Sequence, residues 1–96
     1  MTAPEDAPRV DPALLAIYTH AGRLQSLPFF ANERVLVLRW LAAQIFTPGE
    51  RYTEREVAVL LAPRCLTIDA ATLRRALVDA GVLARTRDGR AYWVAD

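Results

Sequence analysis

The sequence predicts a mainly α-helical fold with a small β-hairpin at its C-terminal end. This is an α+β fold of the winged helix-turn-helix type with an extra N-terminal helix. Capping and helix-breaking residues divide the chain into four helical segments, a short extended segment follows the second of them, and two strand-like segments close the chain. Without the first helix, this order of elements is that of a winged helix-turn-helix.

The first helix is predicted over residues 11–21, after a flexible tail at residues 1–10. Asp11 can cap this helix, and Pro12 suits its first turn because the N–H that proline lacks has no partner there. Gly22 ends the helix, since glycine readily adopts the left-handed conformation found after a helix. The apolar residues of this helix need a partner surface, which is either the core or a dimer interface.

A second helix, over residues 33–46, is predicted to form the centre of the core. Asn32 is its expected N-cap, and Pro48 and Gly49 end it. Apolar side chains lie on nearly every side, which is typical of a helix buried between two layers. The preceding residues 23–30 predict an irregular apolar connection.

Two further helices form the predicted helix-turn-helix. Thr53 and Glu56 have the spacing of a capping box, in which each side chain bonds to the backbone N–H of the other residue. Pro63 ends the helix that they begin. Asp69 caps the next helix, which is predicted over residues 70–79 with apolar residues at helical spacing.

The predicted wing is a β-hairpin at the C-terminal end of the chain. Residues 82–86 and 90–94 have the pattern of two strands, and Asp88-Gly89 joins them. This pair supplies the positive φ angles that a two-residue hairpin turn requires.

The composition indicates one globular domain over residues 11–96. The chain has 96 residues, of which 53% are hydrophobic and 24% charged, so it can bury one core and is too apolar for a disordered chain. Cys65 is the only cysteine, which excludes an intrachain disulfide. The N-terminal residues lack the apolar segment of a signal peptide, and the most apolar run, residues 35–46, is too short to span a bilayer. We therefore expect a cytoplasmic protein without membrane contact.

Three motifs resemble a bacterial family of small domains that has no assigned function. They are YTEREV at residues 52–57, LRRALVDAGVLART at 73–86 and DGRAYW at 88–93, and the resemblance covers residues 27–94. That family occurs alone or behind a helix-turn-helix domain in transcription regulators. The resemblance therefore implies a winged-helix-like fold and, by association, a link to transcription. The helix at residues 11–21 lies outside the shared part.

The distribution of arginine indicates where such a domain would meet DNA. The net charge of the chain is +1, but from Arg64 to Arg90 there are six arginines against three aspartates, a net charge of +3. Every basic residue is arginine, whose planar fork suits phosphates and guanine edges. We expect a non-enzymatic module that binds double-stranded DNA, with helix 70–79 in the major groove. The candidate contacts are Arg64, Thr72, Arg74, Arg75, Arg85, Arg87 and Arg90.

Arg74 and Arg75 are the main candidates on the helix. In the alternative interpretation, one of the two pairs with Asp79 or Glu54 and covers the core with its methylene groups. The sequence leaves both interpretations open.

The hairpin arginines Arg85, Arg87 and Arg90 can reach phosphates, and alternation along a strand places Arg85 and Arg87 on one face. Charges on an exposed hairpin also prevent pairing between molecules, which needs no ligand. A monomer that neutralises three or four phosphates has a salt slope of only about −3. Useful affinity therefore requires a homodimer, formed through helix 11–21, or a regulator partner.

The competing interpretation is a protein-interaction or ligand-sensing module with a winged-helix scaffold and no DNA contact. The near-neutral charge and the absence of lysine favour it. An exposed apolar patch around Phe29, Phe30 and the first helix would support it.

Four aromatic residues raise the possibility of a stacking surface, although core packing is the more common use, above all for the tryptophan of the central helix. They are Trp40, Tyr52, Tyr92 and Trp93.

Catalysis has little support in the sequence. His20 is the only histidine and Cys65 the only thiol, so no catalytic residue, cofactor site or metal site is predicted. Cys65 lies beside Arg64 and is either a redox-sensitive thiol or, more commonly for such a residue, a buried inert one.

Overall fold

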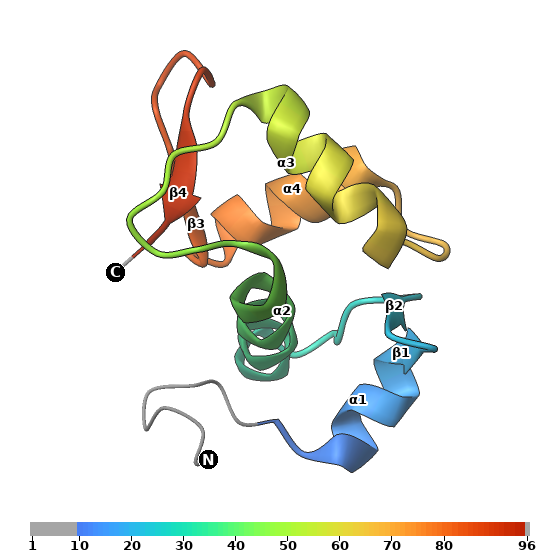
Figure 1. The fold of residues 1–96 in the computed structure, drawn as a ribbon. Helices are drawn as coiled ribbons and strands as arrows, with labels where there is room; N and C mark the ends of the chain where they lie inside the picture. The colour runs from blue at the N-terminus through green and yellow to red at the C-terminus, as the bar shows by residue number, and fades with distance from the viewer. Residues whose placement is uncertain (1–9, 96) are drawn as a thin grey trace, which may run out of the picture.

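The computed structural model describes residues 10–95 and shows a mixed α+β fold (Figure 1). In chain order the elements are α1 (Pro12–Tyr18), β1 (Thr19–His20), β2 (Arg23–Leu24), α2 (Ala31–Ile45), α3 (Glu54–Leu61), the 3₁₀ turn η1 (Ala62–Arg64), α4 (Ala70–Asp79), β3 (Leu83–Arg85) and β4 (Tyr92–Val94). The predicted order is confirmed apart from the short hairpin β1–β2. Of the tail predicted at residues 1–10, all but Val10 lies outside the described residues.

The first helix is shorter than predicted and is followed by a hairpin. The expected helix over residues 11–21 ends at Tyr18, where the hydroxyl of Thr19 donates to the Leu15 carbonyl at 2.7 Å. The chain then turns through Ala21 and Gly22, with φ of 53° and 76°, into β2. Gly22 therefore supplies a positive φ as expected, but in a hairpin turn and not directly after the helix.

This first hairpin is held by contacts to a distant part of the chain. Leu24 has no exposed surface, and its carbonyl accepts from the N–H of Leu66 at 3.0 Å. Arg23 adds a side-chain hydrogen bond from Nε to the Pro63 carbonyl at 3.2 Å. Part of the segment predicted as irregular is thus a strand, which pairs with β1 and is held in place by the connection between α3 and α4.

The helix α2 lies between two layers, as its apolar pattern predicts. Figure 1 shows α1 and the first hairpin on one side of it, and α3, α4 and the second hairpin on the other. The buried apolar residues come from both layers and from α2: Leu24, Val37, Leu38, Leu41, Ala42, Phe46, Val57, Leu61, Leu73, Leu77, Val82, Leu83 and Tyr92. Within residues 10–95, none of the helices has the length and apolarity needed to cross a bilayer.

The start of α2 differs from the prediction. Asn32 is not the N-cap, because the helix begins at Ala31 after Phe30, whose side chain makes no capping bond. The guanidinium of Arg34 fixes this turn instead, since its Nη1 donates to the carbonyls of Pro28 and Phe29 at 3.2 and 3.0 Å.

The capping signals of α3 and α4 are confirmed. The N–H of Thr53 donates to Glu56 Oε1 at 2.8 Å, and the N–H of Glu56 donates to Thr53 Oγ1 at 3.1 Å. Asp69 accepts from the N–H of Thr72 at 2.7 Å. Pro63 does not directly end α3, which stops at Leu61. The chain continues into η1, where proline near the start of a turn breaks no helical hydrogen bond.

A third segment of the chain pairs with the second hairpin through one residue, Tyr52. Leu83 pairs with Val94 and Arg85 pairs with Tyr92, so β3 and β4 are shorter than the predicted strands. On the other side of β4, Tyr52 and Tyr92 exchange two backbone hydrogen bonds of 2.8 Å. The expected extended segment before α3 is therefore present, and the arrangement is compatible with a winged-helix-like fold.

We expect Leu41→Ala to lower the free energy of unfolding by about 2–5 kcal/mol, because a fully buried leucine leaves a cavity when truncated. Leu36→Ala on the same helix is the matched control, since Leu36 is 41% exposed and should cost much less. Urea unfolding followed by circular dichroism measures both values. Equal losses would contradict the central position of α2.

Candidate nucleic-acid interface

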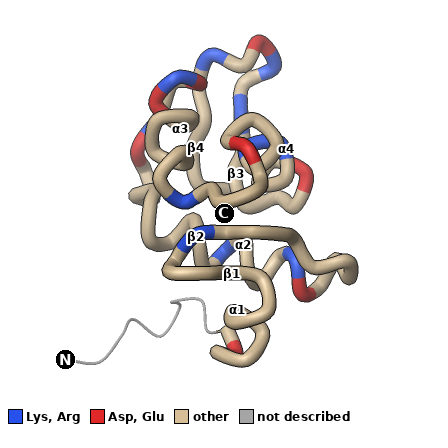
Figure 2. The backbone as a smooth tube through the Cα atoms, turned by 90° about the vertical axis from the view of Figure 1, so that its right-hand side faces the viewer, with Lys and Arg blue, Asp and Glu red and all other residues tan. Residues whose placement is uncertain are grey.

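A charged hollow of about 400 Å³ opens between the start of α3, the outward side of α4 and the second hairpin. We call it the hairpin hollow. It is lined by Glu54, Arg74, Arg75, Val78, Asp79, Arg85, Asp88, Gly89 and Tyr92. Figure 2 shows how basic and acidic positions are interleaved over this half of the molecule. Some of these side chains already form contacts with one another, so only the others are available to a ligand.

Arg74 is committed to internal contacts. Its Nη1 lies 2.9 Å from Glu54 Oε1, and only 19% of its side chain is exposed. Its Cζ also lies over the ring of Tyr92, 6.0 Å from the ring centroid. The alternative interpretation of the arginine pair therefore describes Arg74, with Glu54 and not Asp79 as its partner.

Arg75 also lines the hollow but does not share the contacts of Arg74, because one residue along a helix turns the side chain by about 100°. It is exposed, and its side chain forms no ion pair or hydrogen bond with residues 10–95. Thr72, Arg75 and Asp79 are all exposed on α4 at spacings of three and four residues, so they form one outward stripe. The N-terminal end of this helix is occupied by Asp69, whose pKa is lowered by the hydrogen bonds from Thr72.

The two hairpin arginines Arg85 and Arg87 do not share one strand face as predicted. Strand β3 ends at Arg85, so the alternation that would relate the two residues does not continue to Arg87, which lies in the turn. Arg85 lines the hairpin hollow, whereas Arg87 lies outside its lining. Both side chains are exposed, and neither forms an ion pair or hydrogen bond within the described part of the chain.

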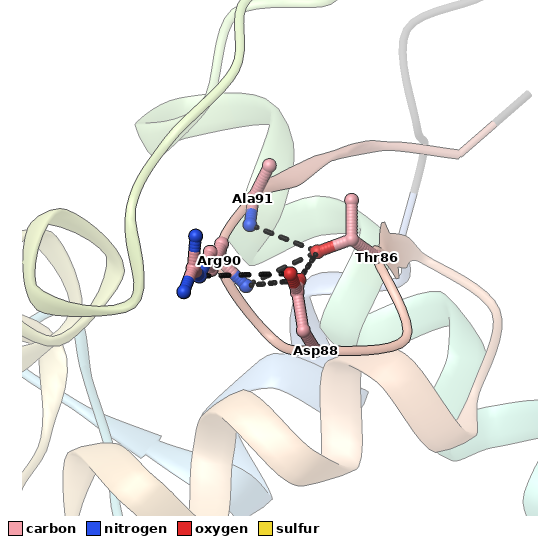
Figure 3. Close-up of polar contacts among 4 residues, drawn as sticks. All are labelled: Thr86, Asp88, Arg90 and Ala91. Carbon is pink, nitrogen blue, oxygen red and sulfur yellow. Dashed lines mark hydrogen bonds and ion pairs between the residues drawn. The ribbon is translucent and has the colours of Figure 1, made fainter.

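The tip of the hairpin is fixed by side chains (Figure 3). The hydroxyl of Thr86 donates to Asp88 Oδ1 at 2.7 Å, and the N–H groups of Arg90 and Ala91 donate to Thr86 Oγ1, both at 3.1 Å. The turn is wider than the predicted two residues, because the N–H of Thr86 donates to the Ala91 carbonyl at 2.9 Å. Gly89 has a positive φ of 73°, but Asp88 does not. The Asp88 carboxylate instead accepts hydrogen bonds from the Thr86 hydroxyl and the N–H of Arg90.

Two other candidate arginines are used differently. Arg64 lies away from the hollow, where its Nε donates to the Gly22 carbonyl at 2.8 Å and its Nη2 to Gln44 Oε1 at 2.9 Å. Arg90 has an 88% exposed side chain with Nε 3.6 Å from Asp88 Oδ2. The structure thus brings Arg74, Arg75 and Arg85 together and leaves Arg64 apart.

The aromatic residues do not form one shared stacking surface. Tyr92 is buried, and the ring of Tyr52 packs edge-on against Phe46 with a centroid distance of 5.1 Å. Arginines cover the two tryptophans: Arg64 lies 5.7 Å above Trp40, and Arg51 lies 4.6 Å above Trp93. No local sequence pattern predicts these two contacts, since the partners are distant in the chain.

Within residues 10–95, no group of three His, Cys, Asp or Glu side chains is placed to hold a metal ion. Cys65 is partly buried, and its Sγ donates to the Leu61 carbonyl at 3.3 Å. Burial, and then the negative charge of Asp69, raise the pKa of this thiol, so its reactive thiolate is disfavoured.

The chain belongs to a bacterial family whose model is described as an uncharacterized protein conserved in bacteria (DUF2087) and matches residues 23–94. The match begins at β2 and ends with β4, so it contains the whole hairpin hollow and leaves α1 outside. No curated protein and no solved structure matches the chain.

The hairpin tip should respond to acid through Asp88. Hydrogen bonds from the Thr86 hydroxyl, and then from the N–H of Arg90, hold the pKa of Asp88 below its usual value. A carboxylate with a lowered folded-state pKa stabilises the folded form fully above its usual pKa. This contribution is lost as the pH falls through the lower, folded-state pKa.

We therefore expect the amide resonance of Arg90 to titrate in that acidic range, and Thr86→Val to raise the pKa of Asp88 toward its usual value. An NMR titration of the carboxyl and amide signals measures both effects. An unchanged Asp88 pKa in the Thr86→Val variant would contradict the hydrogen-bonded tip.

Proposed function

We propose that this family member is a non-enzymatic DNA-binding module of the winged-helix type, linked to transcription, which reads duplex DNA with α4 and contacts its backbone with the second hairpin. One observation carries the proposal. Arg75, Arg85 and Arg87 are exposed on two adjacent elements, and their side chains have no ion pair or hydrogen bond within residues 10–95. Three exposed guanidinium groups on one part of a small domain are suited to a polyanion.

The arrangement of elements supports this interpretation. In winged-helix proteins the second helix of the helix-turn-helix enters the major groove, and the hairpin lies beside it. Here α4 holds that place after α3, and β3 follows α4 directly in the chain. The pairing of Tyr52 with Tyr92 adds the short strand segment expected before α3.

The outward stripe of α4 offers groups of the kind that read bases. Arg75 can donate two hydrogen bonds to the O6 and N7 atoms of guanine, and Thr72 can donate or accept. Asp79 repels phosphates but can accept from the N4 amino group of cytosine. Arg85 and Arg87 would contact phosphates, which fix position without reading sequence.

Affinity from one copy would be low. On a duplex without the preferred sequence Arg75 would also contact a phosphate, and three neutralised phosphates give a salt slope of about −3, which is small compared with the slope of about −10 of a strong repressor. The proposed mode of action therefore includes a second copy or a partner protein that carries further DNA contacts.

A second candidate function is self-association without DNA contact, and one observation favours it. Phe29 and Phe30 are 87% and 64% exposed, and their rings pack edge to face with a centroid distance of 5.5 Å. Arg34 holds the backbone of this pair through its bonds to the Pro28 and Phe29 carbonyls, and Pro28 is buried. Exposed aromatic rings on a fixed loop lose little entropy on association, which favours an interface.

We expect a labelled random duplex to bind the protein with a salt slope near −3 per protomer. Arg75→Ala, Arg85→Ala and Arg87→Ala should each weaken binding, and each lost phosphate contact should reduce the slope by about 1. Arg39→Ala is the matched control, because Arg39 is exposed on α2 and lies outside the hollow. Fluorescence anisotropy across a salt series measures these effects.

The proposal fails if the duplex does not bind at low salt. It also fails if Arg39→Ala weakens binding as much as Arg75→Ala, since the interaction would then be a general effect of charge.

For the second candidate, we expect the scattering mass to exceed that of one chain as the protein concentration rises. Phe30→Ser should restore the mass of one chain, because it removes an exposed aromatic anchor. Val59→Ser is the control, since Val59 is 62% exposed on α3. A monomer at every concentration, or an equal effect of the control, would exclude this use of the phenylalanine pair.

A further inference from the structure

We infer that Arg74 is a positioning residue that sets the relation between α4 and the second hairpin, and that its partner for this task is Glu54. The inference rests on the proposed DNA-binding function, because it assigns Arg74 an indirect role in that function. Its basis is that one side chain from α4 pairs with the first residue of α3 and lies over a ring of β4.

Both partners of Arg74 are held by contacts of their own. Glu54 follows Thr53, whose capping box with Glu56 defines where α3 begins. Tyr92 is 3% exposed and is hydrogen-bonded through its backbone to Tyr52. Arg74 therefore connects two fixed points and does not merely fill space between flexible groups.

The two ends of this contact lie next to the proposed DNA contacts. Arg75 is the residue after Arg74 on α4, and Arg85 is the strand partner of Tyr92 in the hairpin. A change in how Arg74 sits between Glu54 and Tyr92 would shift Arg75 relative to Arg85. Because a rigid spacing between contacts is needed to meet two parts of one duplex, this side chain would control affinity without touching DNA.

The charge of Glu54 gives the pair a second effect. This carboxylate lines the same hollow as Arg75 and Arg85, and its side chain is 55% exposed. Paired with Arg74 at 2.9 Å, its negative charge is compensated close to where phosphates would lie. Loss of Arg74 would leave that charge to repel them.

The test compares Arg74→Met, which keeps the methylene chain over Tyr92 and removes the charge, with the exchange variant Arg74→Glu/Glu54→Arg. Glu54→Gln is a third variant, because a half-exposed surface residue can be changed with little risk to the fold. Thermal unfolding first establishes that each variant is folded. Amide hydrogen exchange of Arg85 and Tyr92 then reports on the hairpin without DNA, and anisotropy reports on duplex binding.

For Arg74→Met and Glu54→Gln we expect faster hydrogen exchange in the hairpin than in the parent protein. For Arg74→Met we also expect about tenfold weaker duplex binding, from the coupling usual between contacting residues, with a salt slope that changes by much less than the value of about 1 for a lost phosphate contact. The exchange variant restores the ion pair but not the guanidinium over Tyr92, so it should recover part of the hydrogen-exchange protection and of the affinity. Arg75→Ala differs by leaving the protection of the hairpin intact while weakening binding.

Two results would overturn the inference. If Arg74→Met lowers the salt slope by about 1 and the exchange variant recovers nothing, Arg74 itself contacts a phosphate, and the proposed function stands without the positioning role. If hydrogen exchange in the hairpin is the same in all variants, Arg74 does not position it.

If the parent protein binds no duplex, the proposed function fails, and the hydrogen-exchange result still decides whether Arg74 fixes the hairpin.

Discussion

The backbone pairing of Tyr52 with Tyr92 connects the parts of this fold that lie around the hairpin hollow. Its two hydrogen bonds of 2.8 Å join the segment before α3 to β4. The ring of Tyr52 packs on Phe46 at the end of α2, and its hydroxyl accepts from the N–H of Thr47 at 2.9 Å. The place where α3 starts, the path of β4 and the end of the central helix are thus fixed together, and Arg74 uses this fixed geometry.

What this surface can bind depends on which arginines already form contacts within the domain. The charge of Arg74 is compensated by Glu54, whereas Arg64 is held by neutral acceptors outside the lining of the hairpin hollow. Arg75, Arg85 and Arg87 carry exposed guanidinium groups on α4 and the hairpin. A net charge of +1 is therefore a poor guide to the interface, because the charge that a ligand meets depends on which arginines gather on one surface.

The elements that could be predicted from the sequence are those whose pattern lies within a few residues. The capping box of Thr53 with Glu56, and the cap at Asp69, depend on spacings of three residues and are present as predicted. The hairpin β1–β2 was missed although its own pairing is local, Thr19 with Leu24 and His20 with Arg23. Strands this short have no sequence pattern, and the contacts of Leu24 with Cys65 and Leu66 that hold them lie about forty residues further along the chain. For the same reason the sequence could name two partners for Arg74 but could not choose Glu54 over Asp79, since that choice is made by tertiary packing.

The most direct test of the central claim is an NMR titration of the arginine side-chain Nε–Hε resonances with a short duplex. We expect the resonances of Arg75, Arg85 and Arg87 to shift in proportion to the fraction bound. Those of the internally bonded Arg64 and Arg74 should remain close to their starting positions. Shifts confined to other arginines, or the absence of any shift at saturating duplex, would show that this surface does not bind DNA.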